Sequence, residues 1–227
     1  MWVGFLLLCF GVTYFFKYLG QYVIDRIDVL LGIEVTDQVA ELSYIMPFGI
    51  NLLFVGFLGP IFEELFFRKA VIDRLRFYGD LPAILISGLI FGLIHGNFSQ
   101  LFYAIAIGVV LGFVYIRTGN VLYTITLHSV FNIIGGVYTT EILRYAEEDT
   151  GALMLLAYGV FVIIASVIGA IFLIANIGRF RSSLQKGECS LTFDQWMNAL
   201  VFNPGMWAFL AWMALMFLSS LLESALA

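Results

Sequence analysis

Three pairs of residues in this 227-residue chain combine chemically useful side chains with a spacing of four. Residues four apart share one face of an α-helix, so the members of each pair can act together. The pairs include both histidines of the chain, and a second glutamate directly precedes the first pair. The pairs are Glu64 with Arg68, Phe91 with His95, and His128 with Asn132, and the additional glutamate is Glu63.

The two adjacent glutamates have different partners in a helix. Glu64 lies one turn before Arg68, which is the right spacing for a salt bridge or a bidentate contact. Glu63 points about 100° away around the helix and is not served by that contact. The spacing therefore predicts one structural carboxylate and one that is free to act as a general base or acid. The alternative is that both glutamates only mark the end of an apolar segment, with their carboxylates in water.

The histidines and the asparagine allow two kinds of chemistry. His128 and Asn132 share a face and could donate hydrogen bonds to an oxyanion that develops during a reaction. Glu63, His95 and His128 are also the donor set of a His₂Glu zinc site. The plainer alternative is that these polar side chains only hydrogen-bond neighbouring helices.

The composition shows what kind of elements must carry these residues. Hydrophobic residues make up 62% of the chain and charged residues 12%, about half the charged share of a soluble globular protein. A soluble domain of this size could not bury so much apolar surface, and disordered chains are polar or highly charged. A net charge of −5 argues against nucleic-acid binding, and two cysteines argue against a disulfide scaffold. We therefore expect an all-α fold, a polytopic transmembrane helical bundle.

The expected bundle has about seven spans and is a single membrane-embedded domain, 1–227, with its motif-bearing core at about 60–135. The first segment has no basic n-region and no cleavage site, so we expect a retained helix rather than a signal peptide. Glycines spaced by four in the third and fourth segments predict close helix packing. These glycines are Gly88, Gly92 and Gly96, then Gly108 and Gly112. The predicted spans are about 2–24, 44–67, 82–96, 99–117, 121–139, 152–177 and 205–222.

Lysine and arginine predict the orientation of the bundle. With seven alternating spans, eight basic residues fall on one side, in two polar connectors at 68–81 and 178–203 and in one turn. Loops on the other side are mostly acidic. Cytoplasmic loops carry an excess of Lys and Arg, so we expect the N-terminus in the cytoplasm and the C-terminus outside. The eight residues are Arg68, Lys69, Arg74, Arg76, Arg117, Arg179, Arg181 and Lys186.

The three pairs resemble the signature of the CAAX protease and bacteriocin-processing family of intramembrane endopeptidases, also called CPBP or Abi. That family is marked by E-E-x-x-x-R, then F-x-x-x-H, then H-x-x-x-N. This chain reads E-E-L-F-F-R at 63–68, F-G-L-I-H at 91–95 and H-S-V-F-N at 128–132. Each motif is weak alone, but all three in order on separate apolar segments are specific.

The resemblance implies an intramembrane endopeptidase that hydrolyses membrane-associated peptides or proteins with a glutamate-activated water. It implies no cofactor, with zinc as the alternative, and the compact loops favour a bacterial or archaeal cell membrane. It also implies a role for each motif residue. Glu63 and His95 would activate the water, His128 and Asn132 would stabilise the oxyanion, Glu64 and Arg68 would hold the site together, and Phe91 would pack it.

Two functions of other classes remain open. The chain could be a catalytically inactive scaffold or regulator that keeps the polar network for packing, although its set of motif residues is complete. It could also be a proton-coupled transporter, because buried Glu and His serve there too; we find no inverted repeat that would support this function. The expected partners are a membrane-associated peptide or protein substrate and the lipid bilayer, and not nucleic acid.

Overall fold

The structure is a computed structural model that describes residues 1–189 and 191–226. All secondary-structure elements assigned in this part of the chain are helices, which confirms the all-α prediction. Segments η1, η2 and η4 are π-helical and η3 is a 3₁₀ turn. The elements are α1 (Trp2–Leu31), α2 (Gln38–Ile45), α3 (Phe48–Asn51), η1 (Leu52–Leu58), α4 (Gly59–Glu64), η2 (Leu65–Ile72), α5 (Asp73–Leu75), η3 (Arg76–Tyr78), α6 (Asp80–Leu93), α7 (Phe98–Thr118), α8 (Val121–Asn132), η4 (Ile133–Val137), α9 (Tyr138–Arg144), α10 (Asp149–Ser182), α11 (Phe193–Val201) and α12 (Pro204–Leu226).

Six helices within the described residues are long and apolar enough to cross a membrane, which confirms a polytopic helical bundle. The third predicted span, 82–96, corresponds to the shorter helix α6. Its 14 residues extend about 21 Å at the helical rise, whereas the hydrocarbon core of a bilayer is about 30 Å thick. The six long helices are Trp2–Leu31, Phe48–Tyr78, Phe98–Thr118, Val121–Arg144, Asp149–Ser182 and Pro204–Ala225.

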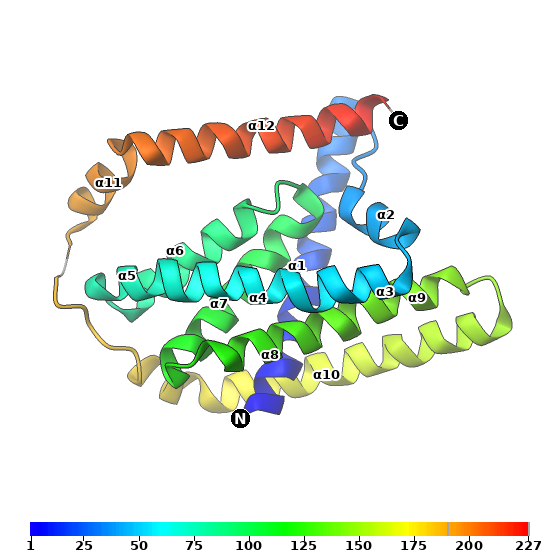
Figure 1. The fold of residues 1–227 in the computed structure, drawn as a ribbon, viewed down its shortest axis with the longest axis horizontal. Helices are drawn as coiled ribbons and strands as arrows, with labels where there is room; N and C mark the ends of the chain where they lie inside the picture. The colour runs from blue at the N-terminus through cyan, green and yellow to red at the C-terminus, as the bar shows by residue number, and fades with distance from the viewer. Residues whose placement is uncertain (190, 227) are drawn as a thin grey trace.

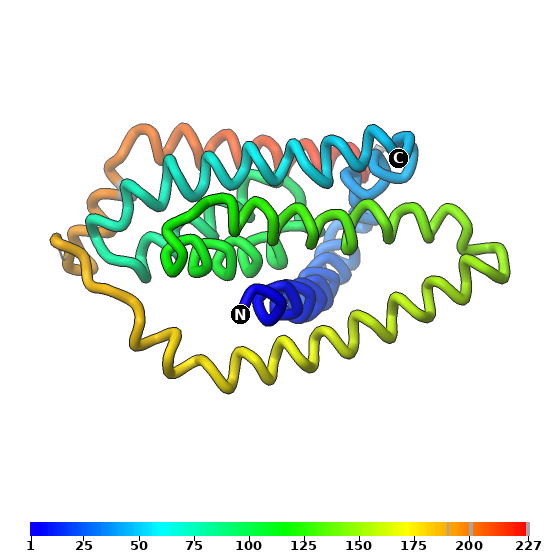
Figure 2. Tube along the Cα trace, turned by 60° about the horizontal axis from the view of Figure 1, so that its bottom comes forward, coloured from blue at the N-terminus to red at the C-terminus, as the bar shows by residue number. Residues whose placement is uncertain are grey.

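Helix α1 lies at the centre of the bundle. Figure 1 shows it crossing α10 and the long helix that runs from α3 to α5. In Figure 2 it lies between α10 on one side and α7 and α8 on the other. The main hydrophobic core joins these four helices and thereby supports α8, which carries His128. Its buried residues are Phe5, Leu8, Cys9, Phe10, Ile107, Leu111, Val114, Leu127, Phe131 and Ala165.

Helices α6 and α7 form a hairpin whose two arms are in close contact. A Cβ atom added at Gly108 would lie 2.9 Å from the Cα of Gly88. A Cβ atom added at Gly88 would lie 2.7 Å from the side chain of Val109. These distances leave no room for a larger side chain, so the close packing predicted from the glycine spacing is confirmed.

The turn between α6 and α7 fixes the backbone beside His95. Gly96 has a φ of 67°, in the left-handed region that glycine adopts readily. The side chain of Asn97 caps α7 by accepting the Gln100 backbone N–H at 2.8 Å. The same side chain donates to the His95 carbonyl oxygen at 3.3 Å. His95 is therefore held at the end of α6 by its own turn.

The π-helical segments adjoin the motif residues. Segment η2 begins directly after Glu64, and η4 begins directly after Asn132. π-Helical turns are rare in proteins overall, and those that occur are often found at functional sites. The third such segment, η1, directly precedes α4, the short helix that ends with the glutamate pair. The two helices that carry Glu64 and Asn132 thus depart from regular α-helical geometry directly after these residues.

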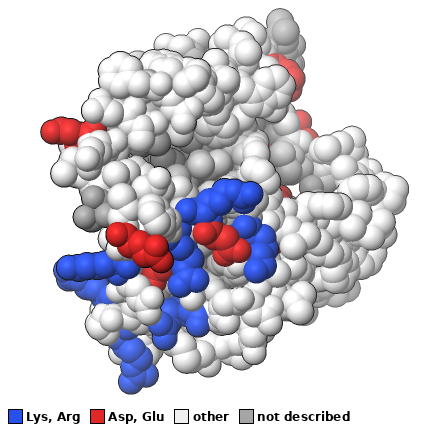
Figure 3. Space-filling model, turned by 60° about the vertical axis from the view of Figure 1, so that its left-hand side comes forward, with Lys and Arg blue, Asp and Glu red and all other residues white. Residues whose placement is uncertain are grey.

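The basic residues gather at one end of the bundle. Figure 3 shows Lys and Arg side chains clustered on the face that lies at the left of Figure 1. Contacts bring the two polar connectors and the turn together there: Gly79 and Lys186 form an isolated β-bridge, and Arg117 donates to the Ser183 carbonyl oxygen at 3.4 Å. The structure contains no membrane, so the cytoplasmic location of this end stays a prediction.

Candidate active site

Glu64 and Arg68 form a fully buried ion pair inside the long helix. The Arg68 Nε–H donates to Glu64 Oε2 at 2.7 Å, and Nη2 donates to Oε1 at 3.2 Å. Both side chains have 0% exposure. This is the bidentate contact expected from their spacing, and such geometry fixes both side chains.

Ser87 of α6 completes the environment of Arg68. The third contact of the guanidinium is a hydrogen bond from Nη1 to Ser87 Oγ at 3.1 Å. The Ser87 hydroxyl in turn donates to the Phe67 carbonyl oxygen at 3.3 Å. Ser87 therefore connects α6 to the helix that carries the glutamates. Ser87 is not among the site residues predicted from the sequence, although Ser87, Phe91 and His95 are spaced by four and share a face.

His128 lies between the two glutamates. Its Nδ1 is 3.1 Å from Glu64 Oε1, and because a carboxylate only accepts, Nδ1 carries the hydrogen. Its Nε2 is 3.7 Å from Glu63 Oε2. In the neutral ring, Nε2 therefore carries the lone pair and can donate a hydrogen bond only after the ring becomes an imidazolium.

Glu63 is accessible where Glu64 is not. Its side chain is 34% exposed, and within the described residues it makes no hydrogen bond and meets no Lys or Arg. Its closest charged or titratable contact is His128 Nε2. The structure thus places one glutamate in a closed ion pair and leaves the other free, as the sequence spacing predicted.

The ring of His95 is oriented by the last turn of α6, which ends two residues before it. Its Nδ1 lies 2.7 Å from the Phe91 carbonyl oxygen, so Nδ1 donates and Nε2 keeps the lone pair. His95 also interacts electrostatically with Glu63 and with His128. An imidazole in this tautomer can accept a proton at Nε2.

Phe91 packs at the centre of the polar residues. Its ring centroid is 5.1 Å from that of His95 and 5.7 Å from that of His128. The Cζ atom of Arg68 lies 5.5 Å from the same centroid, and Phe67 packs edge-on at 5.0 Å. Three separate motifs therefore converge on one aromatic ring.

The side-chain amide of Asn132, predicted as an oxyanion donor, already makes one hydrogen bond within the protein. Its Nδ2 donates one hydrogen to the Val55 carbonyl oxygen at 3.0 Å. Val55 belongs to η1, where the π-helical turn departs from the regular α-helical hydrogen-bond pattern. An amide nitrogen carries two hydrogens, so one remains for another acceptor. Asn132 thus links α8 to the glutamate helix in addition to any role in chemistry.

The zinc alternative requires Glu63, His95 and His128 to converge on one ion. The outer contacts of the histidines suit a metal site, because each ring donates from Nδ1 and keeps Nε2 as a ligand atom. Within residues 1–189 and 191–226, however, no group of three His, Cys, Asp or Glu side chains is gathered closely enough to hold a metal ion. In this part of the chain, the three side chains therefore do not form a preassembled zinc site.

Comparison with known proteins supports the predicted resemblance. Residues 46–134, which contain all three motifs, match the model of the family described as type II CAAX prenyl endopeptidase Rce1-like. The chain is 29% identical over 136 residues to the putative membrane peptidase YdiL of Bacillus subtilis, covering 58% of this chain and 54% of that protein. It is 29% identical over 110 residues to the membrane-embedded CAAX protease MroQ of Staphylococcus aureus, covering 44% of each. The chain thus matches about half the length of these relatives, and no solved structure is significantly similar.

Proposed function

We propose that this chain, whose residues 46–134 match the Rce1-like CAAX endopeptidase family, is an intramembrane endopeptidase that uses Glu63 to activate water. Both relatives are named as membrane peptidases or proteases, and both are bacterial. The substrate class that follows is a membrane-associated peptide or protein, hydrolysed in a bacterial or archaeal cell membrane. The proposal depends on the site rather than on the helical fold, because one fold hosts many functions.

The observation that supports the proposal best is the different placement of two adjacent carboxylates. Glu64 is fully enclosed by Arg68 and His128. Glu63 is 34% exposed and, within the described chain, pairs with no Lys or Arg. A purely structural network would have no need for a second carboxylate left without a hydrogen bond. A general base needs such a free carboxylate near the reacting water.

In the proposed reaction, a water molecule bound by Glu63 and the His95 Nε2 atom attacks the carbonyl carbon of the scissile peptide bond. Glu63 takes one proton from the water as the new C–O bond forms. The same proton passes to the amide nitrogen as the C–N bond breaks. This step releases an amine and a carboxylic acid, whose hydroxyl group keeps the second proton of the water. His95 can accept a hydrogen bond from the water at Nε2, because its Nδ1–H donates to the Phe91 carbonyl oxygen.

The carbonyl oxygen gains negative charge during the attack and needs hydrogen-bond donors. Asn132 can supply the amide hydrogen that Val55 does not use. His128 can donate a hydrogen bond from Nε2–H when it is an imidazolium, while its Nδ1–H keeps its hydrogen bond to Glu64. Glu64 and Arg68 therefore act through His128 by fixing its orientation, and they are positioning residues in this account.

The proposal is tested by incubating the purified protein in lipid vesicles with a library of membrane peptides and identifying new termini by mass spectrometry. Wild type is compared with Glu63→Gln, with Glu64→Gln and with Glu147→Gln, whose glutamate lies in an exposed loop. Relative to wild type and Glu147→Gln, we expect cleavage by Glu63→Gln to be slower by about 10²–10⁴-fold. We expect a strong chelator to have no effect.

Other outcomes would assign other functions. Full cleavage by Glu63→Gln would refute the glutamate mechanism, and loss on chelation with recovery in zinc would refute the metal-free form. Proton-coupled uptake into the vesicles without cleavage would identify a transporter. A folded protein with neither activity would favour the scaffold.

We also propose that the basic end of the bundle faces the cytoplasm, with the N-terminus inside and the C-terminus outside. The eight basic residues predicted to share one side and the clustering seen in Figure 3 support this orientation. A reporter fused to the C-terminus that is active only outside the cell tests it. Activity of a cytoplasm-only reporter at the same position would reverse the orientation.

A further inference from the structure

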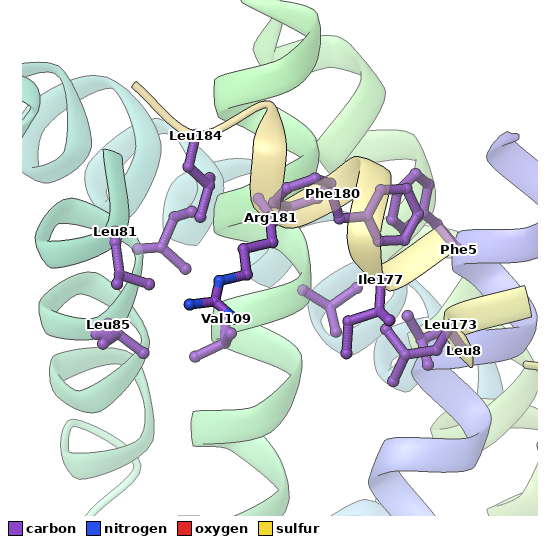
Figure 4. Close-up of a pocket in the computed structure, with 13 residues that line it drawn as sticks. Phe5, Leu8, Leu81, Leu85, Val109, Leu173, Ile177, Phe180, Arg181 and Leu184 are labelled. Atoms are coloured by element: carbon purple, nitrogen blue, oxygen red, sulfur yellow. The ribbon is translucent and has the colours of Figure 1, made fainter. Parts of the chain in front are cut away.

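An apolar cavity lies at the end of the bundle where the basic residues cluster. Its volume is about 210 Å³, and it opens between the α6–α7 hairpin and helices α1 and α10. Figure 4 shows side chains from these four helices facing the same space. None of the motif residues lines this cavity, so it is separate from the candidate active site.

The wall of the cavity is hydrocarbon except at one place. Phe5 and Leu8 of α1 form a buried part of the wall, with 6% and 5% exposure. Leu81, Leu85 and Ile177 lie at its open edge and are each at least 50% exposed. In a membrane-spanning bundle, exposed leucine and isoleucine on α6 and α10 face lipid. The cavity is therefore open to the hydrocarbon of the bilayer.

Among the described residues that line the cavity, Arg181 alone is charged. It belongs to the last turn of α10, and Figure 4 shows its guanidinium group directed between α6 and Ile177. Within the described chain, this side chain has no ion pair or hydrogen bond. The acidic residue nearest in sequence to the α6 wall, Asp80, is already paired: it accepts from Arg76 at 3.2 Å and from the Gln185 backbone N–H at 2.9 Å. A cation is thus present beside a hydrocarbon cavity without a protein anion.

More basic residues gather at this end of the bundle, with some acidic side chains among them (Figure 3). Arg179 and Lys186 flank Arg181 in sequence, and Arg117 reaches the same connector through the Ser183 carbonyl oxygen. Basic groups near a membrane surface attract anionic lipid head groups, by about 1 kcal/mol for each Lys or Arg. A ligand that satisfies both features needs a hydrocarbon chain and a negative group at one end of it.

We propose that this cavity binds part of one acyl chain of an anionic phospholipid and that Arg181 pairs with the phosphate of the same lipid. An engineered apolar cavity of about 150 Å³ accepts benzene, so about 210 Å³ accommodates a short length of acyl chain. The remainder of the lipid lies in the surrounding leaflet. The bound lipid joins the α6–α7 hairpin to α1 and α10, the helices that form the wall.

The experiment measures lipids retained by the purified full-length protein in native mass spectrometry. The probes are phosphatidylglycerol and phosphatidylcholine with identical acyl chains. Arg181→Gln is compared with Arg179→Gln, a matched control at the same helix end whose residue does not line the cavity. We expect wild type to retain phosphatidylglycerol preferentially, and Arg181→Gln to lower that preference about fivefold, which corresponds to about 1 kcal/mol. We expect Arg179→Gln to change it less than twofold.

A second pair of variants tests the hydrocarbon part. Ile177→Trp places an indole in the opening, whereas Ile174→Trp lies one turn earlier at a position that does not line the cavity. Both side chains are exposed, at 57% and 74%, so the fold tolerates the change. We expect Ile177→Trp to abolish retention of both lipids and Ile174→Trp to leave it unchanged. Leu85→Trp, also half exposed, fills the cavity from α6 and should repeat the result.

Three outcomes would overturn the proposal. An equal effect of Arg179→Gln and Arg181→Gln would show attraction by the whole basic surface. Undiminished retention in both Ile177→Trp and Leu85→Trp would place the lipid elsewhere. Retention of a farnesylated peptide but of neither phospholipid would assign the cavity to a lipid-modified peptide. None of these readouts depends on peptide cleavage, so the test stands apart from the proposed protease function.

Discussion

Replacing Glu64 by Met tests the buried ion pair most sharply. The change leaves the Arg68 guanidinium fully buried, with Ser87 Oγ at 3.1 Å as its remaining side-chain acceptor. The two contacts to Glu64, at 2.7 and 3.2 Å, are lost. Breaking a buried pair by removing one partner costs about 3–5 kcal/mol, because the other charge remains buried and uncompensated. We therefore expect the free energy of unfolding of Glu64→Met to fall by about that amount.

The double variant Glu64→Met/Arg68→Met separates stability from catalysis. Replacing both charges of a buried pair by apolar side chains of similar size is often neutral. We expect the double variant to recover most of the stability that Glu64→Met loses. It should remain inactive, since His128 Nδ1–H has lost its acceptor on Glu64 and the ring is no longer oriented.

The assays are unfolding by sodium dodecyl sulfate in mixed micelles and cleavage of the peptide identified with wild type. A Glu64→Met variant as stable as wild type would contradict the burial of the pair. A double variant no more stable than Glu64→Met would show that the uncompensated charge is not the cause. An active double variant would refute the positioning of His128 by Glu64.

Three further changes have expected outcomes. Ser87→Ala removes an acceptor from buried Arg68 and should destabilise the protein by about 1–3 kcal/mol in the same unfolding assay, whereas Ser219→Ala on the surface should change stability by less than about 0.5 kcal/mol. Gly108→Ala would force α6 and α7 apart and cost about 1–3 kcal/mol; Gly159→Ala in α10, where no atom lies within 4 Å, serves as its helical control and should not destabilise. Asn132→Ala should lower the turnover number more than it changes KM, because the spare amide hydrogen serves the oxyanion, and should cost about 1 kcal/mol of stability through the lost bond to Val55. An unchanged turnover number with lowered stability would restrict Asn132 to its contact with Val55.

Regular helical spacing explains which parts of the site could be predicted from the sequence. The pairing of Glu64 with Arg68 needs only neighbours on one helix, and the predicted contact is present. The close packing of α6 on α7 also follows from local spacing, because glycines four apart form a continuous small-residue stripe. The long apolar helices follow from hydropathy. Helix α6 is the exception, because its composition is that of a span but its length is too short.

Contacts between different helices could not be predicted from the spacing of residues along the sequence. Ser87 binds Arg68 across two helices, and nothing in the sequence specifies how α6 is rotated against η2. The bond from Asn132 to Val55 depends on a π-helical segment, whose wide turn has no clear sequence signal. The tautomers of His95 and His128 depend on acceptors that only the fold supplies. The cavity beside Arg181 depends on α1, α10 and the α6–α7 hairpin, which are far apart in sequence.

The most direct test of the central claim is the single-turnover cleavage rate of Glu63→Gln, measured beside its free energy of unfolding. Glu63 is 34% exposed and has no Lys or Arg partner in the described chain, so its replacement should leave the fold intact. General-base catalysis contributes about 10²–10⁴-fold in rate. General-base action of Glu63 predicts a stable Glu63→Gln protein whose cleavage rate is lower by about that factor. A stable Glu63→Gln protein that cleaves at the wild-type rate would contradict it.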